Sequence, residues 1–109
     1  MEAYSLNNMI RGWFIVNFEP SVLKTSEYEV GVKKYRRGDK EDRHYHLEAD
    51  EITVIVSGAV KMDGIHYKEN DIIVIRKGKS TDFECLSDEA VTVVVKTKSV
   101  AGDKYIDTI

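Results

Sequence analysis

Short segments rich in branched and aromatic residues recur along the chain, most of them alternating between apolar and polar positions. They span residues 12–18, 26–35, 43–47, 51–56, 59–62, 65–68, 71–75, 80–86 and 91–96. Alternation with a period of two indicates a half-buried strand, and a run as apolar as 71–75 indicates a strand covered on both faces. No stretch of ten or more residues shows helical periodicity. The pattern therefore predicts an all-β chain.

Turn-forming residues separate these segments. Asp63-Gly64 is a strong signal for a two-residue hairpin, and the charged residues Lys40 to Arg43 are expected to form a solvated loop. Short strands at close, even spacing predict a sandwich or a barrel. We expect residues 1–109 to form one domain with a core of about 27–96, flanked by an N-terminal strand and a polar C-terminal tail.

The strongest chemical signal is a pair of histidines, His44 and His46, followed by Glu51. If residues 43–47 are extended, alternate side chains share a face, so both imidazoles point the same way. Glu51 opens the next strand, and antiparallel pairing could bring its carboxylate beside the two rings. Two imidazoles and one carboxylate suit a divalent transition metal such as Zn, Mn, Fe, Ni or Co. The remaining histidine, His66, is expected to face solvent on a hairpin strand.

The spacing of these residues resembles the first motif of the cupin superfamily, G-x5-H-x-H-x3,4-E-x6-G. Gly38, His44, His46, Glu51 and Gly58 match every defined position. The simpler alternative is a surface turn with coincidental histidines, but five fixed residues at fixed spacing are hard to obtain by chance. The resemblance implies a single-domain cupin jelly-roll β-barrel with the site inside it. It also implies a metal held by the two histidines and the glutamate.

The second cupin motif, G-x5-P-x-G-x2-H-x3-N, is matched only in outline. The substitutions are Asn70 for the first glycine, Arg76 for the proline, Cys85 for the asparagine and Thr81 for the metal-binding histidine. Threonine is a poor ligand for a transition metal, so the sequence supports three protein ligands, with water or substrate completing the set. Asp82 faces away from Thr81 in a regular strand and could replace the missing ligand only through a β-bulge.

Further residues are candidates for the pocket wall. Thr53 shares a face with Glu51, and this face should be the interior. The other candidates are Thr81, Asp82, Phe83 and Tyr35, and packing alone explains the two aromatic residues equally well. The basic residues Arg76, Lys77 and Lys79 could clamp a phosphate or carboxylate group. A hydrated loop is the alternative interpretation of this basic segment.

The opposite face of the Glu51 strand carries Ile52, Val54 and Val56. An outer face this apolar needs a cover, which an N-terminal strand or a second subunit could supply. Cupin-like proteins commonly dimerise through such a surface, so the resemblance leads us to expect a homodimer.

Composition excludes several classes of partner. With 42% hydrophobic residues the chain can build a core, and its 16 basic and 19 acidic residues give no excess of positive charge that would attract nucleic acid or a membrane surface. The longest apolar run is too short to span a bilayer, and no signal peptide is visible. The single cysteine, Cys85, excludes an internal disulfide and is expected in the core. These features favour a cytoplasmic protein.

Two functional hypotheses follow, because a fold alone does not settle a function. The first is a metal-dependent enzyme that acts on a small, polar, anionic molecule. The alternative is a non-catalytic module that binds or senses a small, sugar-like molecule, and the threonine at position 81 favours it. A metal-free isomerase with His44 as the base is a third reading, for which the sequence offers no clear partner group.

Overall fold

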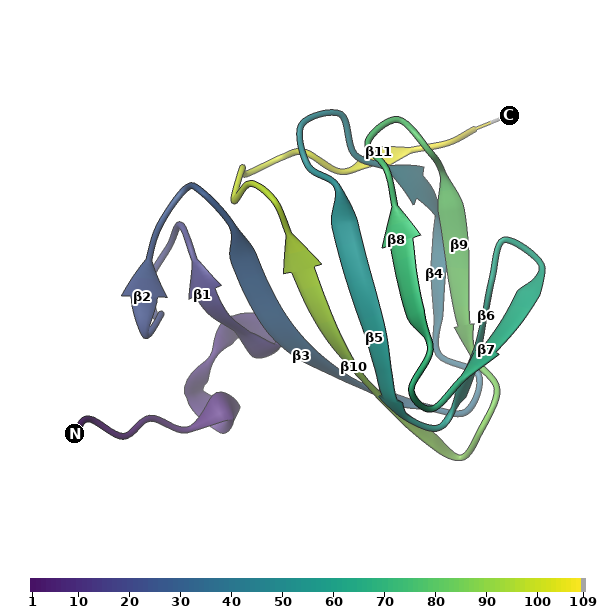
Figure 1. Ribbon diagram of the computed structural model, residues 1–109, viewed down its shortest axis with the longest axis horizontal. Coiled ribbons are helices and arrows are strands. Elements are labelled where there is room, and N and C mark those ends of the chain that lie inside the picture. The colour runs from purple at the N-terminus through teal and green to yellow at the C-terminus, as the bar shows by residue number, and fades with distance from the viewer. Residues whose placement is uncertain (109) are drawn as a thin grey trace.

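The computed structural model describes residues 1–108, and strands make up about half of it (Figure 1). One sheet has six strands in the order β2 (Leu23–Lys24), β1 (Trp13–Val16), β3 (Glu29–Arg36), β10 (Glu89–Lys96), β5 (Glu51–Ser57) and β8 (Ile72–Ile75). The other has five strands in the order β11 (Tyr105–Ile106), β4 (Lys40–Tyr45), β9 (Thr81–Cys85), β6 (Ala59–Met62) and β7 (Ile65–Lys68). Apart from the parallel β1–β2 pair, the pairings are antiparallel. The two sheets form a jelly-roll barrel, which confirms the predicted fold class.

The N-terminal residues precede this barrel as two short 3₁₀ turns, η1 (Leu6–Asn8) and η2 (Ile10–Gly12) (Figure 1). The second turn leads directly into β1, whose Trp13 pairs with Gly31 of β3. No helix among residues 1–108 is long and apolar enough to cross a membrane.

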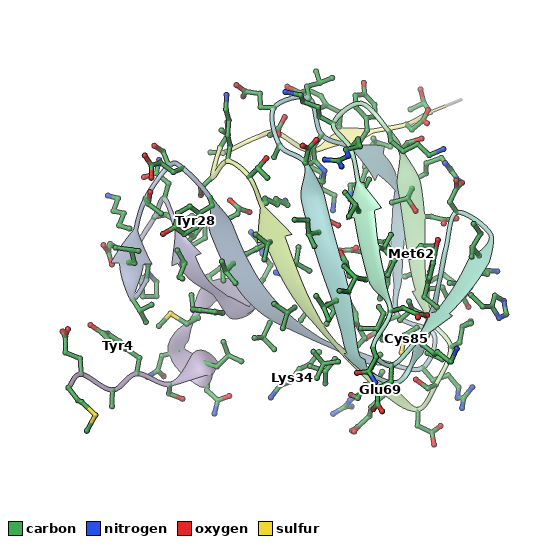
Figure 2. All side chains as sticks on the ribbon, viewed as in Figure 1. Tyr4, Tyr28, Lys34, Met62, Glu69 and Cys85 are labelled. Carbon is green, nitrogen blue, oxygen red and sulfur yellow. The ribbon has the colours of Figure 1, made fainter. Side chains whose placement is uncertain are left out.

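Alternation along the strands separates an inner from an outer face. In β5, Thr53 and Ile55 are buried whereas Val56 is exposed, so the predicted interior face is confirmed. The main core cluster consists of Ile55, Val60, Met62, Ile75, Phe83, Cys85 and Ala90, contributed by both sheets. Figure 2 shows Met62 and Cys85 on the side of the molecule where the two sheets close together. The predicted core position of Cys85 is confirmed.

Glycines set the two ends of the His-His-Glu segment. Gly38 turns the chain between β3 and β4 with a φ of 87°, and Gly58 turns it from β5 into β6 with a φ of 86°. Both angles lie in the left-handed region that glycine enters without strain. At Gly58 a Cβ would also lie 2.3 Å from the carbonyl oxygen of Glu89, so the position has no room for a side chain. The expected Asp63-Gly64 hairpin is present between β6 and β7.

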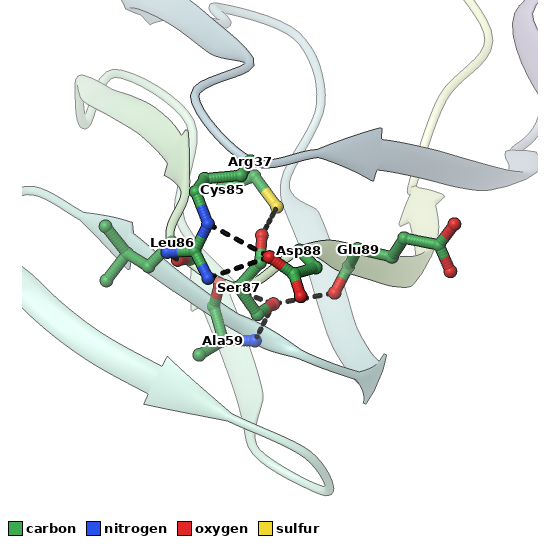
Figure 3. Close-up of polar contacts among 7 residues, drawn as sticks. All are labelled: Arg37, Ala59, Cys85, Leu86, Ser87, Asp88 and Glu89. Atoms are coloured by element: carbon green, nitrogen blue, oxygen red, sulfur yellow. Dashed lines mark hydrogen bonds and ion pairs between the residues drawn. The ribbon is translucent and has the colours of Figure 1, made fainter.

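A network of polar contacts ties together the strand connections next to Gly58 (Figure 3). Ser87 Oγ accepts the backbone N–H of Ala59 at 2.8 Å and donates to the carbonyl oxygen of Glu89 at 2.6 Å. The Arg37 guanidinium forms an ion pair with Asp88 at 3.0 Å. These contacts join the start of β6 to the connection between β9 and β10, and they close this end of the barrel.

Three sequence-based expectations about local structure were wrong. Strand β8 is covered on one face only, because Ile72 and Val74 are exposed. Lys40 to Arg43 belong to β4 rather than to a loop, because backbone pairing with β9 does not require apolar side chains. The C-terminal tail is not a simple polar extension, because Tyr105 and Ile106 pair with β4 as strand β11. A two-residue strand carries too few residues for alternation to be visible in the sequence.

Candidate metal centre and its cavity

A cavity of about 510 Å³ lies between the two sheets, and His44, His46 and Glu51 all line it. The five other residues predicted for the pocket also line it, namely Tyr35, Thr53, Thr81, Asp82 and Phe83. A cavity of this size accommodates a small polar molecule.

His44 is buried on β4, and its Nδ1 lies 2.7 Å from the backbone carbonyl oxygen of Asp42. A carbonyl can only accept, so this contact assigns the ring proton to Nδ1. The lone pair of Nε2 is then available, which is the arrangement that orients a metal-binding imidazole.

His46 follows the end of β4 and is also buried. The pKa of His46 is lowered to about 4, mainly by burial, with smaller contributions from Lys96 and the neighbouring His44. Its Nε2 is buried without a hydrogen-bond partner among the described residues, and its ring lies edge-on to that of His44 with 5.4 Å between centroids. The backbone N–H of Gly78 donates to the His46 carbonyl oxygen at 2.6 Å, which fixes the backbone at this position.

Glu51 begins β5 and projects into the same cavity. Burial raises the pKa of the Glu51 carboxyl, whereas Lys96, Thr53 and His44 act in the opposite direction. Thr53 Oγ1 donates a hydrogen bond to Glu51 Oε2 at 3.2 Å. Lys96 stands directly opposite Glu51 in the pairing of β10 with β5. Because burial disfavours the ionised form of this carboxyl, a cation bound beside it would stabilise the carboxylate.

The loop between His46 and Glu51 is held by the C-terminal tail. The buried carboxylate of Asp103 accepts the backbone N–H groups of Leu47 at 2.9 Å, Glu48 at 3.1 Å and Ala49 at 3.2 Å. The N–H of the next residue, Asp50, donates to Thr97 Oγ1 at 3.0 Å. Sequence reasoning missed this role of Asp103, because an aspartate in a polar tail carries no signal of what it binds.

The residues expected to supply a fourth metal ligand, Thr81 and Asp82, direct their side chains to backbone groups instead. Thr81 pairs with His44 in register, and its hydroxyl donates to the carbonyl oxygen of Asp82 at 2.8 Å. The Asp82 carboxylate accepts the backbone N–H of Asp63 at 2.8 Å. Among residues 1–108, no group of three or more His, Cys, Asp or Glu side chains is already arranged to hold a metal ion.

Other predicted residues fall into two groups. Tyr35 and Phe83 both line the cavity and also pack on each other, with ring centroids 4.4 Å apart. The basic segment lies elsewhere: Arg76 pairs with Asp50 at 3.6 Å and Lys79 with Asp63 at 3.4 Å, and neither these residues nor Lys77 are among the described residues that line the cavity. This placement favours the hydrated-loop interpretation. His66 is exposed on β7, as expected.

Sequence reasoning also missed a group of cavity residues on β1, β3 and β10. Trp13 packs against Gly31, where an added Cβ would lie 2.6 Å from Trp13 Cε3. Lys33 and Lys96 lie near the ring, with Nζ 3.8 Å and 5.2 Å from its centroid. Alternation in β3 contained the signal, because residues 31, 33 and 35 share a face, so an inward Tyr35 implies an inward Lys33.

No protein-family model and no curated protein matches the sequence. Solved structures do match. The chain is similar to KdgF from a Halomonas species, with 20% identity, a TM-score of 0.63, and coverage of 72% of this chain and 74% of that one. It is similar over 94% of both chains to an uncharacterised protein with a double-stranded beta-helix domain from Klebsiella pneumoniae, with 19% identity and a TM-score of 0.68.

A third similar structure is a sugar phosphate isomerase from a cupin superfamily, from Silicibacter pomeroyi. The identity is 27% and the TM-score 0.61, and the match covers 67% of this chain and 52% of the other. The jelly-roll arrangement of the two sheets, the site inside the barrel and these structural likenesses lead to one conclusion. The chain has the fold of the cupin superfamily.

Proposed function

We propose that this protein holds a divalent transition metal at His44, His46 and Glu51 and acts as a metal-dependent enzyme on a small, polar, anionic molecule. The observation that carries the proposal is the buried Nε2 of His46, which lacks a hydrogen-bond partner within the described chain. Leaving a buried polar atom unsatisfied costs about 1–3 kcal/mol, so such an atom commonly has a partner that completes it. A metal ion is a partner suited to a neutral imidazole nitrogen.

The donor set fits a metal chemically. The Asp42 carbonyl directs His44 Nε2 to be unprotonated, and the lowered pKa of His46 keeps that ring neutral at pH 7. Glu51 supplies the carboxylate and is oriented by Thr53. The three side chains would close around the ion by rotation about their own side-chain bonds. When bound, the metal supplies a Lewis acid or an oxygen-binding centre with open positions.

The residues of this chain would do the remaining work. Asp103 holds the loop that separates His46 from Glu51, and Gly78 holds the backbone of His46. Tyr35 and Phe83, whose rings pack on each other, would form an aromatic part of the cavity wall. The name of one similar structure, a sugar phosphate isomerase, is consistent with an anionic substrate.

The test is elemental analysis of protein purified without chelator or affinity metal. We expect about one Fe, Mn, Ni, Co or Zn ion per chain, as a three-ligand site would bind. His46→Ala should lower the metal content at least tenfold. The matched control is His66→Ala, which makes the same substitution at an exposed histidine of β7 and should leave the metal content unchanged.

Protein that takes up none of these five metals, even after removal by chelator and re-addition, contradicts the metal proposal. Equal metal loss in both histidine variants contradicts the assignment of the site.

A non-catalytic module that binds or senses a small molecule is the second candidate. Two observations favour it: Thr81 directs its hydroxyl to the backbone, and no ready-made metal cluster exists among residues 1–108. Elemental analysis separates the two candidates, because only the enzyme proposal requires a bound metal. A metal-free cavity would bind a polar ligand through Thr53 and the lysines.

We also propose that two copies of this chain associate through the outer face of the six-stranded sheet. Strand β8 lies at one edge of this sheet, and its Ile72 and Val74 are 65% and 47% exposed. Val56 on β5, the neighbouring strand, is 45% exposed. A flat apolar face can meet its own copy across a two-fold axis without needing complementary charges, which makes a second copy the simplest cover.

A further inference from the structure

The cavity extends from the histidines to a second group of side chains, formed by Trp13, Lys33 and Lys96. We call this group the Lys-Trp-Lys cluster. The two lysine ammonium groups lie 3.8 Å and 5.2 Å from the centroid of the Trp13 ring, and all three residues line the cavity that His46 lines. Cations at these distances are attracted to the ring face, which positions both ammonium groups on the cavity wall.

Lys33 differs from Lys96 in its counter-ion. Lys96 Nζ lies 3.6 Å from Glu29 Oε2, whereas no carboxylate within residues 1–108 forms an ion pair with Lys33. The only hydrogen bond given by Lys33 Nζ in the described chain goes to the carbonyl oxygen of Arg11, at 2.6 Å. The pKa of Lys33 is lowered to about 8, first by burial and then by the positive charges of Arg11 and Lys96, while the carboxylates of Glu41 and Glu29 only partly offset this. An anion from a ligand would supply the missing counter-charge.

Lys96 connects this cluster to the histidine end of the cavity. In the sheet it stands between Glu51 of β5 and Glu29 of β3, as the direct cross-strand partner of both. Neighbouring strands are about 4.8 Å apart, so a molecule of a few carbon atoms is long enough to reach from Lys96 on β10 to Glu51 on β5. One small ligand can therefore contact the Lys-Trp-Lys cluster and the His-His-Glu end together.

We propose that the Lys-Trp-Lys cluster is an oxyanion subsite, which takes a phosphate or carboxylate group of the ligand while the opposite end of the ligand faces His44, His46 and Glu51. The second half of this statement rests on the proposed function; the anion subsite itself does not. The substrate class is thus an elongated polar molecule with a terminal negative charge. Apolar and cationic molecules are poor candidates.

A purely structural role for Lys33 makes a different prediction. By donating to Arg11, Lys33 fastens η2 to the edge of β3. If that were its whole role, replacing Lys33 would lower stability and leave anion binding unchanged. Measuring anion binding directly separates the two roles.

The experiment uses inorganic phosphate and malonate as probes on full-length protein treated with chelator, at constant ionic strength. Trp13 is the single tryptophan, so its fluorescence reports on the cluster alone. Both a saturable change in fluorescence and a rise in Tm are followed. Removing metal first prevents the probes from binding a metal ion, so failure of the anion subsite and failure of the metal site give different results.

We expect at least one probe to bind saturably and Lys33→Met to weaken it at least tenfold. The matched control is Lys34→Met, at the adjacent, exposed lysine labelled in Figure 2, and it should bind like the wild type. If Lys33→Met does not fold, Lys96→Met decides, with a several-fold loss expected. The stronger probe identifies the group as phosphate or carboxylate.

The proposal is overturned if neither probe changes the fluorescence or the Tm of the wild type. It is also overturned if Lys33→Met binds the probe like the wild type. Equal weakening by Lys33→Met and the control Lys34→Met overturns it too, since equal loss indicates nonspecific attraction to surface charge.

Discussion

Where the six-stranded sheet borders the cavity, its two faces have the reverse of the usual polarity, whereas Ile55, Ile75 and Ala90 of the same sheet belong to the apolar core. The face inside the barrel carries charged and polar residues, namely Glu29, Lys33, Tyr35, Glu51, Thr53, Thr92 and Lys96. The face outside the barrel carries branched apolar residues, which cross-strand pairing places together: Val30, Val32, Ile52, Val54, Ile72, Val74, Val93 and Val95. In most sandwiches the buried face is apolar and the outer face polar.

This reversal supports the proposal that the two faces serve different partners. Inside, Lys96 is paired with Glu29, but Lys33 forms no ion pair with a carboxylate among residues 1–108, and a partly buried charge without a partner is unfavourable. The apolar groups outside are favourable only if another surface covers them. The comparison therefore links the proposed ligand site and the proposed dimer to one property of the same sheet.

The largest effect is expected from a charge at the centre of the outer face. Val54→Asp should convert the dimer to a monomer, because in a symmetric interface the new carboxylate appears twice and like charges brought together cost several kcal/mol. Light scattering coupled to size-exclusion chromatography measures the mass. The control is Ile65→Asp, at an exposed apolar residue of β7 on the other sheet, which should stay dimeric. A wild type that is monomeric at every concentration would sink the dimer proposal.

A smaller effect is expected from one added methyl group on the inner face. Gly31→Ala places a Cβ 2.6 Å from Trp13 Cε3, so the ring must shift. Overpacking of this kind costs about 1–3 kcal/mol. Denaturant unfolding measures the loss, and Trp13 emission should change in the folded state.

Gly38→Ala is the control for the inner-face methyl, because the added Cβ there has no neighbour within 4 Å. It adds backbone strain, since the φ of Gly38 is 87°, but it should leave Trp13 emission unchanged. An unchanged emission spectrum in Gly31→Ala would contradict the packing of Trp13 on Gly31.

The smallest effect concerns pH and Lys33. Burial lowers the pKa of Lys33 to about 8 in the folded chain, from an ordinary value of 10.5; Arg11 and Lys96 add to this, while Glu41 and Glu29 oppose it. Between these two values the unfolded chain keeps a proton that the folded chain has released. Stability should therefore rise as the pH increases from about 8 to about 10.5.

We expect this rise to be on the order of 1 kcal/mol, because solvent screens a partly exposed ammonium. Chemical unfolding across this pH range measures it, and Lys33→Met should remove the Lys33 contribution. A Lys33→Met variant with the same pH dependence as the wild type would show that Lys33 does not titrate there.

The sequence was most informative where a side chain's direction follows from simple alternation or from a motif. The first motif, with its two glycines, two histidines and one glutamate, assigned the candidate centre to one segment of the sequence. Alternation in β5 correctly predicted that Thr53 and Ile55 face the interior. Asn70 shows why the second motif could still be aligned with the sequence although its first glycine is replaced. Its φ is 75°, and asparagine tolerates this left-handed conformation better than most residues, so it can replace a glycine.

Contacts between distant segments were not predictable. The group formed by Trp13, Lys33 and Lys96 depends on how β1, β3 and β10 pair, and no local pattern states which strands will be neighbours. Lys40 to Arg43 were assigned to a loop because their charges suggested exposure, whereas the backbone forms β4. The three-residue metal centre stays a prediction, since it depends on rotations of side chains that the sequence does not specify.

The hydrogen bonds of Asp103 have a consequence for the order in which the protein is made. Leu47 and Asp103 are 56 positions apart, so a ribosome adds Asp103 long after the histidines and Glu51 have emerged. Until then the backbone N–H groups of residues 47–49 lack the Asp103 carboxylate that accepts them in the folded chain, and these hydrogen bonds cannot form. In a growing chain, the loop between His46 and Glu51 therefore lacks this support until residue 103 has been added.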